Sequence, residues 1–81
     1  ARAALGQHIE ALELFEQSLA AFEAIGADYG AALTLSDIAG SYKALGQAER
    51  AREAYNRSAD RYRKCGVEAD ALKAEQGLAE I

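Results

Sequence analysis

Proline, methionine and tryptophan are absent from this 81-residue chain, and cysteine and histidine each occur once. A lone cysteine, Cys65, can form neither an internal disulfide nor a thiolate metal site. The absence of proline removes the strongest helix breaker. Because methionine is missing even at position 1, we expect the sequence to be a fragment or a processed part of a longer protein.

Long apolar runs and a basic surplus are missing as well. No stretch approaches the roughly 20 apolar residues that span a bilayer, and no signal-peptide pattern is present. We therefore expect no membrane association and a cytoplasmic, intracellular location. The net charge of −4 argues against nucleic-acid binding, because such proteins carry a basic surplus that replaces the counterions of the phosphates.

The residues that are present favour a soluble helical domain. Hydrophobic residues make up 51% and charged residues 27% of the chain, which is ordinary for one small globular domain. Frequent alanine and glutamate favour helices. The charge is uneven, since residues 1–40 hold six acids and one base, whereas residues 41–81 hold seven acids and eight bases.

Glycines recur every 20 residues, between segments with apolar residues at helical spacing. These glycines are Gly6, Gly26, Gly46 and Gly66. Glycine commonly ends a helix because it adopts the left-handed conformation without steric cost. The spacing predicts four helices, over residues 7–25, 28–45, 47–65 and 68–80, with Asp28 as an N-cap. Residues 1–5 would form the last turn of a preceding helix.

The sequence also matches itself after a shift of 40 residues. Leu5-Gly6-Gln7 returns as Leu45-Gly46-Gln47, Phe15 as Tyr55, Ser18 as Ser58, Phe22 as Tyr62 and Ala39 as Ala79. The repeating unit is therefore a pair of helices. We predict a single domain over residues 1–81, made of a half repeat (1–26), a full repeat (27–66) and a partial repeat or capping helix (67–81).

Short links and matched small residues predict how the helices pack. Connections of two or three residues force neighbouring helices to be antiparallel. The first helix has an apolar stripe of Ala11, Phe15, Ser18, Phe22 and Ile25, widened by Leu12 and Leu19. Alanines at equivalent points (Ala11, Ala39, Ala51, Ala79) would let helices approach closely, and large aromatics would fill the space beside them. The fold class is all-α.

One string of residues resembles a tetratricopeptide repeat. It runs Leu35-x-x-Ile38-Ala39-x-x-Tyr42-x-x-Leu45-Gly46, then Ala51-x-x-x-Tyr55-x-x-Ser58. The 40-residue unit and the missing proline resemble the longer variant found in kinesin light chain and in bacterial regulators. The resemblance implies antiparallel helix pairs in a right-handed α-solenoid fragment of about four helices. Ser18 and Ser58 stand where the family prefers alanine, and Glu75 stands in the place of Leu35.

The resemblance also implies a function, because family members typically bind peptides or partner helices in the groove lined by the first helix of each pair. On the second helix it places five residues on the groove side: Leu33, Ser36, Asp37, Gly40 and Lys43. Gly40 could let a ligand backbone approach, or it could serve close helix packing or simply be tolerated. Asp37 stands where an asparagine would grip a carboxylate, so this carboxylate-binding mode is disfavoured.

The third helix has a possible basic face of Arg50, Arg57, Arg61 and Lys64, and the first helix is acidic. These two helices would lie side by side in a solenoid. The arginines could then attract the acids of the first helix weakly. Alternatively, they could bind an acidic partner or a second copy of the chain.

No catalytic constellation is present, so we do not expect an enzyme, a metal or a cofactor. His8 has no second histidine or cysteine at the spacing of metal ligands. We therefore expect it to be a solvent-exposed surface residue rather than a metal ligand. Cys65 is on the apolar stripe, where a buried small hydrophobe is expected and a reactive thiol is the alternative. The leading hypothesis is a protein or peptide interaction scaffold. Self-association into a homo-oligomer through the open repeat ends is the alternative.

Overall fold

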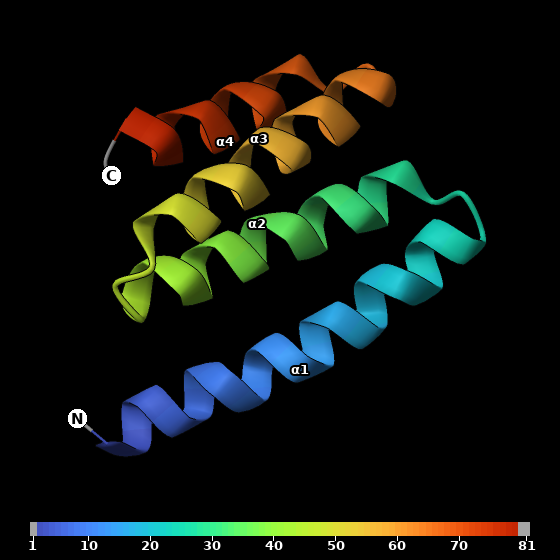
Figure 1. Ribbon diagram of the computed structural model, residues 1–81. Coiled ribbons are helices and arrows are strands. Elements are labelled where there is room, and N and C mark those ends of the chain that lie inside the picture. The colour runs from blue at the N-terminus through green and yellow to red at the C-terminus, as the bar shows by residue number, and fades with distance from the viewer. Residues whose placement is uncertain (1, 80–81) are drawn as a thin grey trace.

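Four helices follow one another in the computed structural model, which describes the backbone of residues 2–79 and the side chains of residues 6–79. Their bounds are α1 (Arg2–Ala24), α2 (Asp28–Ala44), α3 (Ala48–Lys64) and α4 (Glu68–Ala79). Each helix packs on the one before it, antiparallel to it (Figure 1). The predicted all-α fold of antiparallel helix pairs is therefore confirmed. Residues 1, 80 and 81, which the predicted domain includes, lie outside the described part.

The first helix is longer than predicted. Residues 2–5 form its first turn, and Gly6 lies inside it rather than ending a preceding helix. Gly6 does not have the positive φ of the three turn glycines. The repeat of the Leu-Gly-Gln sequence was therefore a misleading boundary signal, because a glycine ends a helix only where the chain also turns back.

The other three repeating glycines end helices as predicted. Gly26, Gly46 and Gly66 have φ angles of 70°, 78° and 76°, which only glycine adopts without strain. At the end of α1 the amide of Ala27 donates to the carbonyl oxygen of Phe22 at 2.9 Å, and the amide of Gly26 donates to that of Glu23 at 3.2 Å. The same pair of bonds recurs after α2 and α3. Each turn is thus a Schellman motif, which satisfies two carbonyls that the helix itself leaves unpaired.

Asp28 does not cap α2 as predicted. Ala27 holds the cap position, no side chain bonds to the helix start, and Asp28 is the first helical residue. Its carboxylate accepts a hydrogen bond from Arg61 at 3.0 Å instead. A negative charge in the first turn still interacts favourably with the helix dipole.

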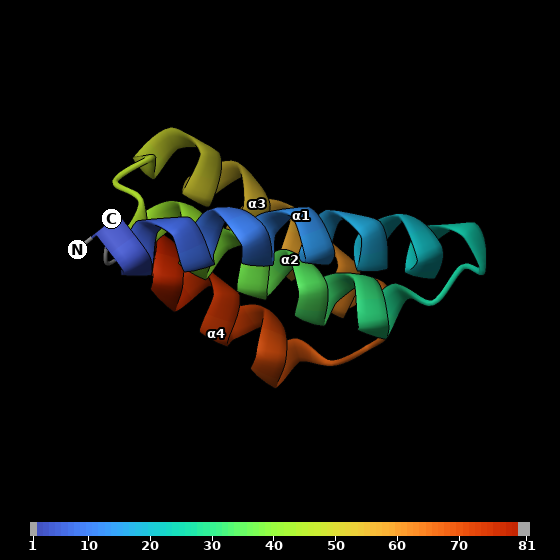
Figure 2. The same ribbon diagram turned by 90° about the horizontal axis from the view of Figure 1, so that it is seen from below.

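The four helices form two layers. Seen from below, α1 and α3 lie toward one face and α2 and α4 lie toward the other (Figure 2). One apolar cluster joins α1, α2 and α3 around Leu35, and a second joins α2, α3 and α4 around Tyr62. Over residues 2–79, none of the helices combines the length with the apolar character that a membrane span requires.

Equivalent positions of the repeat differ in burial. Ala39 and Ala51 are fully buried as predicted, whereas Ala11 is half-buried and Ala79 is exposed. Ser58 is fully buried and donates to the carbonyl oxygen of Ala32 at 2.8 Å. The predicted apolar stripe of α1 is wrong at Ser18 and at Ile25, because both side chains are exposed. Only helices in the middle of the array have a neighbour on both sides. Residues at equivalent repeat positions are therefore buried at the centre and exposed at the ends.

Candidate functional site

The five groove residues predicted on α2 share one side of the helix. Leu33, Asp37, Gly40 and Lys43 are exposed and Ser36 is half-buried, and their spacing of three and four residues places them in one stripe. The buried residues of α2, among them Leu35 and Ile38, lie between these positions and face the other helices. The structure therefore brings the five residues together on an accessible helix face.

Sequence reasoning missed Tyr29, which extends this stripe by one turn. Its side chain is exposed, and its ring packs edge-on against the ring of Tyr62 from α3, with 5.8 Å between ring centroids. Tyr29 precedes Leu33 by four residues, so the helical spacing itself could have identified it. We call Tyr29 together with Leu33, Ser36, Asp37, Gly40 and Lys43 the groove face.

Gly40 has open space beside it. A methyl group added at its Cα would meet nothing within 4 Å among the residues that the structure describes. Close helix packing, one of the explanations considered for this glycine, is therefore wrong. Access for a ligand backbone and simple tolerance both remain as explanations. Gly30 differs sharply, because an added Cβ would lie 2.6 Å from the Phe22 ring.

Two groups near the groove face have shifted pKa values. Partial desolvation raises the pKa of Asp37 above its ordinary value of 3.8, although its side chain is open to solvent on one side. Burial also raises the pKa of Tyr62, and the fields of Asp70, Tyr29 and Asp37 add to this effect. Asp37 and Asp70 have no ion-pair partner among the described residues.

On the opposite face, two arginines of the predicted basic face reach acidic residues of the neighbouring helices. Arg57 lies 3.5 Å and Arg61 lies 3.3 Å from the same carboxylate oxygen of Glu23. Arg61 also pairs with Asp28. Exposed pairs of this kind stabilise a protein by under about 1 kcal/mol each. The acidic α1 and the basic α3 thus attract each other, as one reading of the sequence proposed, and binding of an acidic partner stays a prediction.

The other two residues of the basic face make no ion pair among the described residues. The guanidinium of Arg50 lies 5.8 Å from the ring centroid of Tyr42, a cation–π geometry. Lys64 is exposed near the end of α3. The two are therefore the residues of this face least engaged within the chain.

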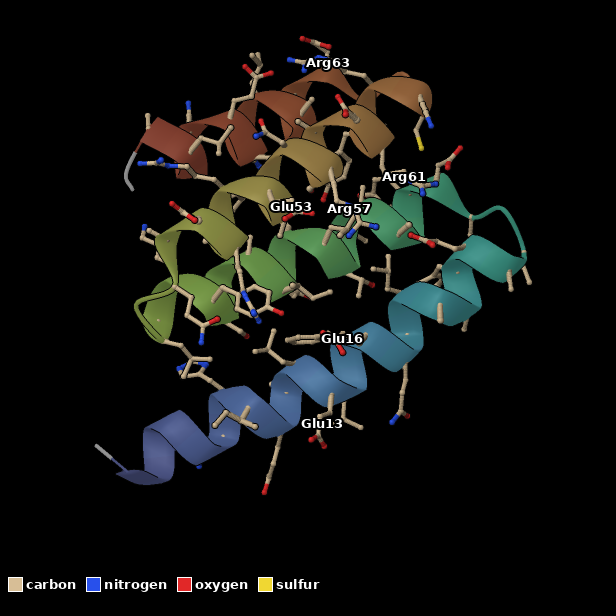
Figure 3. All side chains as sticks on the ribbon, viewed as in Figure 1. Glu13, Glu16, Glu53, Arg57, Arg61 and Arg63 are labelled. Carbon is tan, nitrogen blue, oxygen red and sulfur yellow. The ribbon has the colours of Figure 1, made fainter. Side chains whose placement is uncertain are left out.

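A cavity of about 230 Å³ opens between α1 and α3, above α2. Its floor is apolar, and its rim carries the charged residues Glu16, Glu53, Arg50 and Arg57. Figure 3 shows Glu53 and Arg57 on α3 and Glu16 on α1 around this region, while Glu13 lies on the side of α1 turned away from α2. Because both signs of charge occur on the rim, the cavity does not select a ligand by charge.

Ion pairs join α3 to α4 at the end of the array. Arg63 contacts Glu75 on α4, and it lies 3.4 Å from Glu68. Glu75 stands at the repeat position of the buried Leu35. The substitution of a paired carboxylate for a buried leucine makes this end of the array more polar than its centre.

Neither Cys65 nor His8 belongs to a cluster of metal-ligating side chains among the described residues. Cys65 is exposed rather than buried as predicted, because it is the C-cap of α3 and sits at the turn, as Ile25 does after α1. His8 is half-buried. No group of three or more metal-ligating side chains occurs in the described range.

Comparison with known proteins identifies the family. The tetratricopeptide repeat pattern matches residues 1–64.

The chain belongs to the tetratricopeptide repeat family.

The match spans α1, α2 and α3, and the helix pairs of the structure have the arrangement expected for such a fragment. No curated protein and no solved structure matches the chain. Tetratricopeptide repeats generally serve in protein–protein interactions, and the family assignment gives this chain that general role.

Proposed function

We propose that this tetratricopeptide repeat chain is a non-catalytic scaffold that binds a peptide or partner helix along the groove face of α2. The 40-residue unit supports a place among the longer variants of the family, such as those of kinesin light chain and bacterial regulators, within a larger repeat or regulatory protein. We expect no nucleic acid, membrane or cofactor to take part. The fold and the exposed stripe on α2 support this proposal.

The observation that carries it is the exposure of Tyr29 and Leu33 on the groove face. Their side chains are 47% and 44% exposed, and they lie one helical turn apart on the helix that the family uses for binding. Burial of such side chains by a partner is favourable at about 25 cal/mol for each Å² of apolar surface covered. An aromatic and an aliphatic side chain together form the kind of anchor that dominates many interfaces.

A matched pair of leucine substitutions tests the proposal. Leu33→Ser removes an exposed leucine from the groove face, and Leu14→Ser removes an exposed leucine from α1, outside that face. Each variant would be immobilised and used to capture proteins from a lysate of the source, with circular dichroism to check folding. We expect Leu33→Ser to lose a partner that the unchanged chain and Leu14→Ser both retain. Equal capture by all three would contradict binding through the groove face.

A second candidate function is self-association, which the open ends of the array favour. Leu14 and Leu72 are 63% and 49% exposed, whereas their repeat equivalents, Ala54 and Ala32, are 4% and 0% exposed. The centre of the array thus covers the positions that both ends leave open. Two copies could cover these leucines by packing end to end.

Sedimentation equilibrium distinguishes the two functions. Self-association predicts a mass that rises with concentration, and a return to the monomer mass when Leu14 and Leu72 are both replaced by serine. The scaffold proposal predicts the monomer mass throughout. A constant monomer mass up to about 100 μM would exclude end-to-end pairing with the micromolar affinity typical of weak specific interfaces.

A further inference from the structure

The cavity between α1 and α3 takes no part in either function proposed above. Its floor consists of buried apolar side chains from three helices, namely Leu19, Leu35, Ile38 and Ala54. Its volume is about 230 Å³. An apolar cavity of about 150 Å³ takes up benzene, whereas pockets for drug-sized ligands begin at about 300 Å³. The cavity is therefore of the right size for a single large side chain.

A small residue at position 54 keeps this cavity open. The equivalent residue of α1 is Leu14, whereas Ala54 presents only a methyl group to the cavity. A leucine at position 54 would fill part of the space. Unfilled apolar space in a core lowers stability, so the chain loses stability here that a residue used at the equivalent position would restore. Such a loss is typical of a binding site.

The mixed charges of the rim are complementary to an aromatic ring, whose face is negative and whose edge is positive. Arg50 makes no ion pair among the described residues, and its guanidinium lies 5.8 Å from the centroid of the Tyr42 ring. Glu16 on α1 and Glu53 on α3 make no ion pair over residues 6–79 either, and both lie around the cavity (Figure 3). A neutral ring can thus meet a cation at its face and a carboxylate at its edge.

We propose that the cavity binds the side chain of a tyrosine or tryptophan that a protein partner presents to α1 and α3. The ring packs on the apolar floor beside the Tyr42 ring, and Arg50 lies over its face in a cation–π contact. The O–H or N–H group of the side chain donates a hydrogen bond to the carboxylate of Glu16 or Glu53. None of the groove-face residues lines the cavity, so this site is a second anchor, separate from the groove face.

Blocked amino acids test the choice of side chain. The N-acetyl amides of tryptophan, tyrosine, phenylalanine and leucine are each titrated into the methyl-labelled chain, and NMR shifts of the Leu35 and Ile38 methyls report binding at the cavity floor. We expect the tryptophan and tyrosine amides to bind with dissociation constants on the order of 1 mM. Phenylalanine amide should bind about threefold more weakly, because it lacks the hydrogen-bond donor. Leucine amide should bind about tenfold more weakly, because it also lacks the ring.

Two matched pairs of variants locate the site. Ala54→Leu fills the cavity and should weaken binding of tyrosine amide about tenfold, whereas Ala20→Leu, at an exposed alanine of α1 outside the cavity, should not change it. Arg50→Gln should weaken binding about threefold, because it removes the cation. Arg52→Gln, at an exposed arginine of α3 outside the cavity, should have no effect. Arg50 is exposed, so its variant is expected to fold, which circular dichroism would check.

Each other outcome overturns the inference. If leucine amide binds as tightly as tyrosine amide, or if Arg50→Gln and Arg52→Gln have equal effects, the cavity does not select an aromatic ring. If tryptophan amide leaves the methyls of Leu35 and Ile38 unshifted up to its solubility limit, the cavity is not a binding site. The groove function is judged separately by the capture experiment with Leu33→Ser, since Leu33 does not line the cavity.

Discussion

The centre of the array and its two ends contain equivalent residues in different surroundings. Ser58 is buried against Ala32, whereas its equivalent Ser18 is exposed. Ala54 is buried, whereas the equivalent Leu14 is exposed. In a solenoid each helix pair is covered only by its neighbours. The position in the array therefore decides whether a side chain contributes to the core, and the local sequence does not.

The same comparison separates stability from function. The joint of α2 and α3 is rich in buried alanines and other small buried side chains, whereas the larger apolar side chains Tyr29, Leu33 and Leu72 stay on the surface. Surface leucines and tyrosines contribute little to folding but can contribute to binding. We therefore expect substitutions at the joint to change the free energy of unfolding, and substitutions on the groove face to change the binding of partners.

The largest expected effect is at Leu35, in the joint. Leu35→Ala should lower the free energy of unfolding by about 2–5 kcal/mol, because the side chain is fully buried and leaves a cavity. Leu14→Ala, which truncates a leucine at the open end, should change it by less than about 0.5 kcal/mol. Urea unfolding followed by circular dichroism measures both. Similar losses in the two variants would contradict the distinction between centre and end.

Two glycines in α2 should respond in opposite ways. Gly30→Ala should destabilise the chain by about 1–3 kcal/mol, because the added Cβ would overlap the Phe22 ring. Gly40→Ala meets open space and should stabilise the helix by about 0.5–1 kcal/mol. Thermal unfolding compares the two midpoints. A lower midpoint for Gly40→Ala would show that its surroundings are not open.

The two equivalent serines sharpen the comparison further. Ser58→Ala should cost about 1 kcal/mol, because it removes the buried hydrogen bond to the carbonyl oxygen of Ala32. Ser18→Ala should be neutral or slightly stabilising, since the serine is exposed in a helix. Urea unfolding of the two variants, compared at one temperature, gives the difference. Equal effects would mean that the neighbouring helix contributes nothing at position 58.

The smallest expected effect concerns Asp37 and pH. Its pKa is raised in the folded chain, so the folded state binds a proton more readily than the unfolded state, and stability falls as pH rises above 3.8 through the raised pKa. At pH 7 Asp37→Asn should therefore be as stable as the unchanged chain or more so, by up to about 0.5 kcal/mol. Below pH 3.8 the difference in the free energy of unfolding between Asp37→Asn and the unchanged chain should vanish. A variant that is less stable at pH 7 would contradict the direction of the shift.

The sequence predicted the fold well, because its strongest signals are local. Three turn glycines at a spacing of 20 determined where α1, α2 and α3 end, and the apolar spacing determined their type. Gly6 misled the prediction because one glycine cannot reveal whether the chain turns. Cys65 and Ser18 were misplaced because burial depends on a neighbouring helix, which a single segment does not specify.

The groove face could be predicted only in part. Leu33 and Asp37 followed from the family resemblance, and the structure places them on one exposed stripe. Tyr29 was missed because no repeat equivalent marks it, since position 69 is alanine. The meeting of Tyr62 with Tyr29 required the packing of α3 against α2 and could not be read from spacing within one helix.

Site-specific crosslinking in the source cells tests the central claim, that the groove face binds a partner, most directly. A photoreactive benzophenone amino acid would replace Leu33 or Gly40 on the groove face and, as controls, Leu14 on α1 and Asp60 on α3. The account predicts a crosslinked partner, identified by mass spectrometry, from positions 33 and 40 and from neither control. Crosslinks from position 14 to a second copy, or to partners from the controls alone, would contradict it.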